Sequence, residues 1–174
     1  MALVAGNTNY VSQYLNDTFP GEIKWDRNLI NVTSLDIETK FGDGFPEPAL
    51  ADQEVTAITM KNNIDDTYYT FGCGEYDVDN ALLQTHEVIY VKCADERELL
   101  HKFVYHWSKT SPDIVTGWNC EFFDIPYLIN RIKRVFDNGR EKFLSPWRMI
   151  DERETHTGYG QSTLKYEIKG VAIL

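Results

Sequence analysis

Two acidic residues separated by one position, Asp36 and Glu38, are well suited to chemistry. They lie in the run 34–39, whose alternation predicts a β-strand with both carboxylates on one face and Leu35 and Ile37 on the other. Neighbouring negative charges are costly unless solvent, a proton or a cation relieves them, and Mg²⁺ prefers oxygen ligands of this kind. The spacing alone leaves two readings open, a cation site or the solvated face of an edge strand.

A third carboxylate, Asp124, stands where a strand gives way to a helix. The β-branched residues 114–116 predict the strand, and apolar residues at helical spacing predict a helix over 125–136, with Pro126 tolerated in its first turn. Sites in α/β sheets usually lie at the carboxyl ends of strands, so we expect Asp124 to approach Asp36. A plain helix N-cap is the alternative role for Asp124.

The other periodic segments predict an α/β fold, a mixed sheet with helices packed on it. The β-rich runs 55–60 and 67–71 are separated by polar residues and predict a hairpin, and residues 88–91 predict another short strand. Asp95, followed three positions later by Glu98, is a capping-box arrangement that opens a helix.

A second hairpin is predicted near the end of the sequence. Residues 149–155 are expected to pair with the alternating run 163–169 across a turn at 157–160. We expect the apolar run 171–174 to be followed by further structure, because a sheet strand rarely ends a domain unprotected. Residues 1–30 have the character of the trailing part of a preceding domain.

Phe45 is a large aromatic residue in the Gly- and Pro-containing loop 40–48 that follows the carboxylate pair. An aromatic ring in this position either tucks into the core and pins the loop, or stacks on a nucleic-acid base. The residue pattern leaves both roles open.

The charge balance argues against an independent nucleic-acid binder, because the net charge of the 174 residues is −10. The charge is uneven, however: residues 131–148 hold six Lys and Arg residues against two acidic residues. This basic segment is either a phosphate-facing patch or a solvated helix end and loop.

Cys73, Cys93 and Cys120 have no paired spacing for zinc and are expected to be reduced, mostly buried thiols. No apolar run reaches the length of a membrane span, and the first residues do not resemble a signal peptide. We therefore expect no membrane partner.

Several of these residues together carry a family resemblance. Residues 36–39 (Asp-Ile-Glu-Thr), 117–119 (Gly-Trp-Asn) and 123–127 (Phe-Asp-Ile-Pro-Tyr) resemble the first and second motifs of the 3′→5′ proofreading exonuclease of family B DNA polymerases. The loop 43–48 and the stretch 127–132 are similar to the replicative polymerases of T-even-like bacteriophages, including those of cyanobacteria.

The resemblance, which covers residues 10–174, implies a ribonuclease H-like fold: a mixed sheet flanked by helices, with an inserted β-hairpin. Residues 31–174 are then the exonuclease domain. Two Mg²⁺ or Mn²⁺ ions are implied, with Asp36 bridging both, Glu38 holding the first and Asp124 the second. Two ions roughly 3.5–4 Å apart activate the attacking water and neutralise the leaving oxygen.

The resemblance also implies contacts with the 3′ end of single-stranded DNA. Phe45 and Phe123 become stacking groups for the last bases and Asn119 a polar contact. The hairpin within 149–168 helps to pass the primer end between the exonuclease site and the remainder of the polymerase. The expected location is the cytoplasm of an infected bacterial host.

One departure from the family pattern matters. Its third motif, Tyr-x-x-x-Asp, is not found after Asp124, so we expect a domain truncated before that motif and weak or inactive alone. Two alternatives stay open: a non-catalytic docking fragment of a split polymerase, and a free-standing exonuclease with the same four-carboxylate (DEDD) chemistry.

Overall fold

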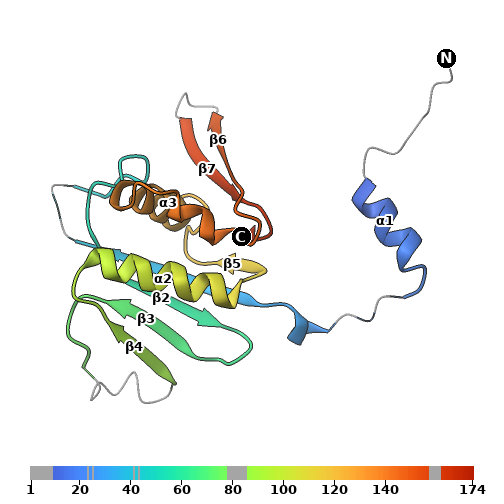
Figure 1. The fold of residues 1–174 in the computed structure, drawn as a ribbon, viewed down its shortest axis with the longest axis horizontal. Helices are drawn as coiled ribbons and strands as arrows, with labels where there is room; N and C mark the ends of the chain where they lie inside the picture. Colours follow the sequence, from blue (N-terminus) through green and yellow to red (C-terminus); the bar gives the residue numbers. More distant parts are fainter. Residues whose placement is uncertain are drawn as a thin grey trace.

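The computed structural model describes residues 10–22, 24, 26–40, 42, 44–77, 86–156 and 162–174. Within them lie a six-stranded mixed sheet, a separate two-stranded hairpin and three α-helices (Figure 1). The predicted α/β, ribonuclease H-like class is confirmed.

The main sheet has the order β4-β3-β2-β1-β5-β8, with β1 at its centre. The strands are β1 (Val32–Thr39), β2 (Val55–Asn62), β3 (Tyr68–Gly72), β4 (Val88–Lys92), β5 (Ile114–Thr116) and β8 (Ala172–Ile173). The β1–β2 and β2–β3 pairs are antiparallel, which confirms the first predicted hairpin, and the β3–β4, β1–β5 and β5–β8 pairs are parallel.

The helices are α1 (Tyr10–Thr18), α2 (Glu96–Thr110) and α3 (Asp124–Val135), with 3-10 helices η1 (Arg27–Leu29) and η3 (Arg140–Leu144). The predicted capping box is present at α2: the Asp95 carboxylate accepts from the Glu98 amide at 2.8 Å, and Glu98 Oε2 accepts from the Ala94 amide at 2.7 Å.

Strand β1 alternates as predicted, with Leu35 and Ile37 buried and Asp36 and Glu38 exposed. Leu35 lies opposite Met60 of β2, so both face the same core. The buried stripes of α2 and α3 belong to this single core, and both helices lie over the same side of the sheet in Figure 1. Asp36 and Glu38 lie on the other, exposed face of β1.

The second predicted hairpin is also confirmed. Strands β6 (Ile150–His156) and β7 (Ser162–Ile168) pair antiparallel and project from the body next to α3 (Figure 1). Tyr166 of β7 donates to Asn130 of α3 at 2.6 Å, which fixes the base of the hairpin to the helix. The predicted turn at 157–160 lies outside the described residues.

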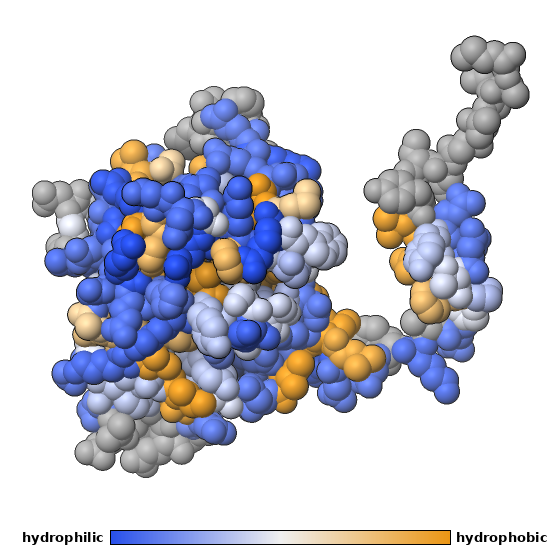
Figure 2. All heavy atoms as spheres, viewed as in Figure 1, coloured by the Kyte–Doolittle hydropathy of each residue, from blue (hydrophilic) through white to orange (hydrophobic). Residues whose placement is uncertain are grey.

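Helix α1 stands apart from the body (Figure 1), and its residues are exposed from Val11 onward. None of the described helices is long and apolar enough to cross a membrane. The hydropathy view in Figure 2 shows a mostly hydrophilic body, with apolar residues also visible on the α1 arm.

Candidate active site

The approach of α3 to β1 begins at a glycine. Parallel pairing of β1 with β5 ends at Ser34 and Thr116, and the next residue, Gly117, passes so close that an added Cβ would lie 2.3 Å from the Leu35 carbonyl oxygen. No larger residue fits there without displacing the backbone. Gly117 therefore lets the chain that leads to Asp124 stay against the carboxylate strand.

A tight turn then sets the start of α3. Asn119 has a left-handed backbone with φ of 62°, which asparagine tolerates better than most residues. Its carbonyl accepts from the amides of Phe122 at 3.1 Å and Phe123 at 2.8 Å. Asn119, proposed from the resemblance as a DNA contact, is exposed and has this backbone role as well.

Asp124 is the first residue of α3 and is buried, with 2% of its surface exposed. Burial and then the nearby charge of Asp36 raise its pKa from 3.8 to about 6. The Ile37 amide, which lies between Asp36 and Glu38 in the sequence, lowers the pKa by hydrogen bonding. The structure thus places the Asp124 carboxylate against the segment of β1 that carries the acidic pair.

One oxygen of this carboxylate, Oδ2 of Asp124, is buried and has no hydrogen-bond partner. A buried carboxylate oxygen without a donor is expensive, and the neighbouring Asp36 adds repulsion. A bound cation would relieve both costs, so the carboxylates present fit a divalent metal ion.

Glu38 shares the exposed face of β1 with Asp36. Alternate positions on a strand are about 6.5–7 Å apart along the backbone, so the second carboxylate does not simply duplicate the position of the first. Across the described part of the chain, no group of three or more His, Cys, Asp or Glu side chains is arranged to hold a metal ion. Of the two acids on β1, Asp36 is the one whose charge raises the pKa of Asp124.

Three aromatic side chains form a row beside the carboxylates. Phe45 is 85% exposed, and its ring centroid lies 5.4 Å from that of Phe123. Phe123 in turn stacks on Tyr127 at 5.7 Å, and Tyr127 is fully buried. The role of Phe45 as a core residue is thereby excluded, whereas its role as a stacking group fits an exposed ring beside the residue before Asp124.

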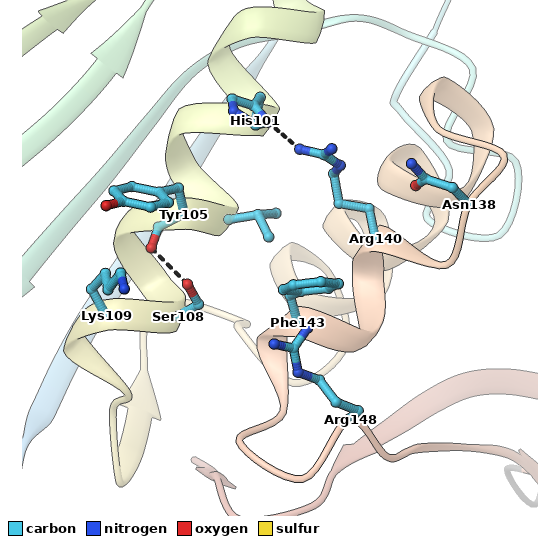
Figure 3. A pocket seen from close by; sticks show the side chains of 9 residues that line it. His101, Tyr105, Ser108, Lys109, Asn138, Arg140, Phe143 and Arg148 are labelled. Carbon is cyan, nitrogen blue, oxygen red and sulfur yellow. Dashed lines mark hydrogen bonds between the residues drawn. The ribbon is translucent and has the colours of Figure 1, made fainter.

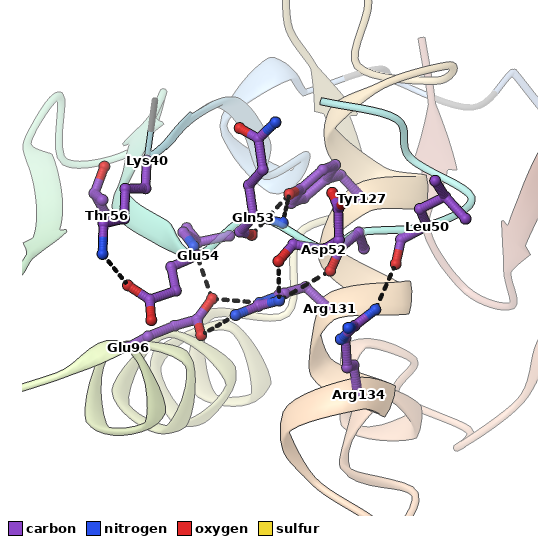
Figure 4. A network of polar contacts seen from close by, with 12 residues as sticks. Lys40, Leu50, Asp52, Gln53, Glu54, Thr56, Glu96, Tyr127, Arg131 and Arg134 are labelled. Carbon is purple, nitrogen blue, oxygen red and sulfur yellow. Dashed lines mark hydrogen bonds and ion pairs between the residues drawn. The ribbon is translucent and has the colours of Figure 1, made fainter. Parts of the chain in front are cut away.

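A polar network from α3 and α2 holds the segment after Phe45, residues 48–55 (Figure 4). Arg131 makes a bidentate pair with Glu96, at 2.6 and 2.7 Å, and also donates to two main-chain carbonyls of this segment at 3.0 and 3.1 Å. The Tyr127 hydroxyl donates to the Gln53 carbonyl at 2.7 Å. These contacts fix the connection between β1 and β2 on the surface of α3.

Sequence reasoning missed two features of this region. The Arg131–Glu96 pair joins residues 35 positions apart, and no local pattern indicates it. Trp118 is 93% exposed between Gly117 and Asn119. A signal for Trp118 was available, because a bulky aromatic residue outside any apolar periodicity is a candidate for surface contact.

The cysteines agree with expectation. Cys93 and Cys120 are buried, Cys73 is partly buried, and all three are free thiols. Burial, and then the nearby Asp124 charge, raise the pKa of Cys120 to about 12, so it stays protonated beside the candidate site.

The central strand β1 carries two acidic residues and pairs with the parallel strand β5, and a third acidic residue stands at the start of α3. This arrangement is that of a ribonuclease H-like exonuclease fold. The sequence matches the family model "DNA polymerase family B, exonuclease domain" over residues 9–174. The chain belongs to this family.

Similar proteins include two phage polymerases. The DNA-directed DNA polymerase of Escherichia phage RB69 is 37% identical over an alignment of 190 residues. The alignment covers 92% of this chain and 21% of the relative. The DNA-directed DNA polymerase of Enterobacteria phage T4 is 32% identical over an alignment of 191 residues, which covers 97% of this chain and 21% of the relative. The DNA polymerase delta catalytic subunit of Caenorhabditis elegans is 37% identical over an alignment of 57 residues, which covers 30% of this chain and 5% of the relative. The chain thus spans about one fifth of the length of the phage relatives.

Proposed function

We propose that this chain is the proofreading part of a phage replicative polymerase and hydrolyses the 3′-terminal phosphodiester of single-stranded DNA. The observation that carries the proposal is the buried Asp124 carboxylate, with one oxygen lacking a partner, beside Asp36. A nuclease with a metal-assisted mechanism needs such an uncompensated acidic site, whereas a purely structural helix start does not.

Asp36, Glu38 and Asp124 would hold the divalent ions, Mg²⁺ or Mn²⁺. When bound, such ions supply a nucleophilic hydroxide at neutral pH and neutralise developing charge on phosphate oxygens. Other residues of the chain would position the DNA. Exposed Phe45, leaning on Phe123, provides a face on which the terminal base stacks. Exposed Asn119, whose carbonyl accepts from the Phe123 amide, is the polar contact.

Hairpin β6–β7 and the arm at residues 1–30 are proposed to meet the remainder of the polymerase. The hairpin projects from the body and would help to move the primer end between sites. The arm carries exposed apolar residues, among them Val11 and Leu15, as expected of the end of a preceding domain. Relatives from phages suggest the cytoplasm of an infected bacterium as the place of action.

The proposal is tested by hydrolysis of a 5′-labelled single-stranded oligonucleotide with Mn²⁺ or Mg²⁺. We expect the 174-residue chain to act slowly, because the Tyr-x-x-x-Asp motif that would supply a fourth carboxylate is not found after Asp124. We expect Asp36→Ala and Asp124→Ala to abolish both the activity and Mn²⁺ binding, while Glu47→Ala, at an exposed acid outside the site, leaves them unchanged.

A docking role without catalysis is the second candidate, favoured by the projecting β6–β7 hairpin and by the exposed apolar residues of α1. The same assay, repeated with a longer chain that includes a Tyr-x-x-x-Asp helix, separates the two. Restored, metal-dependent hydrolysis supports the proofreading function. If the longer chain binds no Mn²⁺ and stays inactive, the docking role is supported instead.

A further inference from the structure

A pocket of about 490 Å³ lies between α2 and the segment around η3, away from the carboxylates (Figure 3). Its α2 wall includes His101, Tyr105 and Lys109, and its opposite wall includes Arg140, Phe143 and Arg148. The volume falls in the range of small-molecule sites. Arg140 and Arg148 belong to the basic segment 131–148, and the proposed nuclease chemistry uses neither.

The lining of this pocket has one sign of charge. Three permanent cations line it, Lys109, Arg140 and Arg148, and the lining residues include no carboxylate. This is unexpected for a chain with 27 acidic residues and a net charge of −10. Glu141, the acid next to Arg140, is buried and is not part of the lining.

The three cations are held by aromatic rings and not by acids. The Arg148 guanidinium lies 3.3 Å from the Phe143 ring centroid, Arg140 lies 4.6 Å from that of Phe136, and the Lys109 ammonium lies 5.5 Å from that of Tyr105. Within the described part of the chain, none of the three forms an ion pair with a carboxylate. Stacking orients an arginine while leaving its N–H edge available to an anion.

His101 adds a donor to the same wall. Arg140 contacts His101 Nδ1, and because a guanidinium only donates, this ring nitrogen accepts. The neutral ring then carries its proton on Nε2, which is free to donate to an oxygen anion. Exposed Tyr105 and Phe143, at 62% and 44%, add aromatic surface at the pocket.

We propose that this pocket binds the phosphate group of a nucleotide. Fork-shaped guanidinium donors, an ammonium and a ring N–H match the oxygens of a phosphate, and the adjacent aromatic surface suits a base. The phosphate comes either from a free mononucleotide or from a DNA strand. The proposal does not depend on the metal site, which lies elsewhere on the fold.

The test is a titration of the ¹⁵N-labelled 174-residue chain in EDTA, followed by NMR through the side-chain Nε–H signals of its arginines. Inorganic phosphate and deoxyadenosine 5′-monophosphate should shift the Arg140 and Arg148 signals, and deoxyadenosine, which lacks phosphate, should not. Arg148→Gln and Lys109→Gln, one from each wall, should each weaken phosphate binding severalfold and together roughly tenfold or more. Lys142→Gln removes one charge from η3 outside the lining and should change binding less than twofold.

A short oligodeoxyadenylate distinguishes the two sources of phosphate. Tighter binding than the mononucleotide, with a steeper loss on adding salt, assigns the pocket to a DNA strand, and equal or weaker binding assigns it to a free nucleotide. Asp36→Ala should leave all of these shifts unchanged. The proposal is overturned if deoxyadenosine shifts the signals as phosphate does, if neither lining variant weakens binding in a folded protein, or if Asp36→Ala abolishes it.

Discussion

Asp124 carries an electrostatic cost in the metal-free protein, and this cost sets how stability depends on pH. Its folded-state pKa is raised to about 6, above the unfolded value of 3.8. The folded state therefore holds the proton more tightly than the unfolded state between these two values. The stability of the folded state falls as pH rises through this window, and the penalty is complete above pH 6.

We predict that Asp36→Asn stabilises the protein in EDTA at pH 8 by on the order of 1 kcal/mol, because it removes the like charge that faces Asp124. At a pH of about 3 or below the gain should vanish, since Asp124 is then mostly protonated in both states. Urea unfolding at the two pH values measures the difference. Glu87→Gln, at an exposed acid next to the edge strand β4, serves as the control. An Asp36→Asn protein that is no more stable at pH 8 would contradict the coupling.

Phe45 is the side chain whose removal should affect DNA binding without affecting the fold, because 85% of its surface is exposed. Stacking of one base contributes roughly 1–3 kcal/mol, so Phe45→Ala should weaken binding of a single-stranded oligonucleotide about tenfold. Fluorescence anisotropy with Mg²⁺ present measures the affinity. Leu50→Ala, which removes another exposed apolar side chain, should leave it unchanged; equal losses in both variants would argue against stacking.

At the scale of elements, α3 joins the candidate site to the loop beside it. Its first residue is Asp124, and one to two turns later Tyr127 and Arg131 bind the main chain of the 48–55 segment. Helix α2 contributes Glu96, whose Oε1 accepts from the Val55 amide at 2.7 Å at the start of β2. Two helices and the β1–β2 connection are therefore joined by one largely buried ion pair and the hydrogen bonds around it.

We predict that Arg131→Ala lowers the free energy of unfolding by about 3 kcal/mol or more, because it leaves Glu96 and two carbonyls without their charged donor. Arg131→Lys should recover part of the loss, since lysine keeps the charge but not the bidentate geometry. Arg134→Ala, which removes one 3.3 Å bond from an exposed side chain, is the matched control and should cost little. Similar losses for Arg131→Ala and Arg134→Ala would mean that the buried pair is not what joins the helices to the β1–β2 connection.

At the scale of the whole molecule, the net charge of −10 opposes the approach of DNA. The candidate site adds to this repulsion, because its negatively charged carboxylates lie where the DNA strand is proposed to bind. Divalent ions change the sign of the local interaction and would bridge carboxylate and phosphate.

We therefore predict that oligonucleotide binding by the chain is weak in EDTA and becomes severalfold tighter in Mg²⁺. To prevent hydrolysis, a terminal phosphorothioate oligonucleotide is used, and affinity is measured by anisotropy at constant ionic strength. The gain should be lost in Asp124→Ala and kept in Glu87→Ala, at an exposed acid next to the edge strand β4. A Mg²⁺ effect of the same size in both variants would show that the ion acts elsewhere.

Much of this organisation followed from local patterns. The alternation around Asp36, the capping box at Asp95 and the β-rich run 55–60 each act over a few residues, where hydrogen bonding and burial follow the backbone period. The family resemblance then linked Asp36 with Asp124, which are 88 positions apart. The match to the family model over residues 9–174 confirms the family assignment. The roles given to the individual site residues stay predictions.

The sequence by itself predicted most of the strands, the helices α2 and α3, the exonuclease family and three candidate acidic residues, because each prediction depends on residue type and short-range spacing. Only the tertiary structure decided that Asp124 is buried with an unpartnered oxygen beside Asp36, and that Phe45 is open to solvent. It alone decided that Lys109 and Arg148, from separate segments, line one pocket free of acids. Burial and electrostatic coupling depend on which distant segments meet, and no local period encodes that meeting.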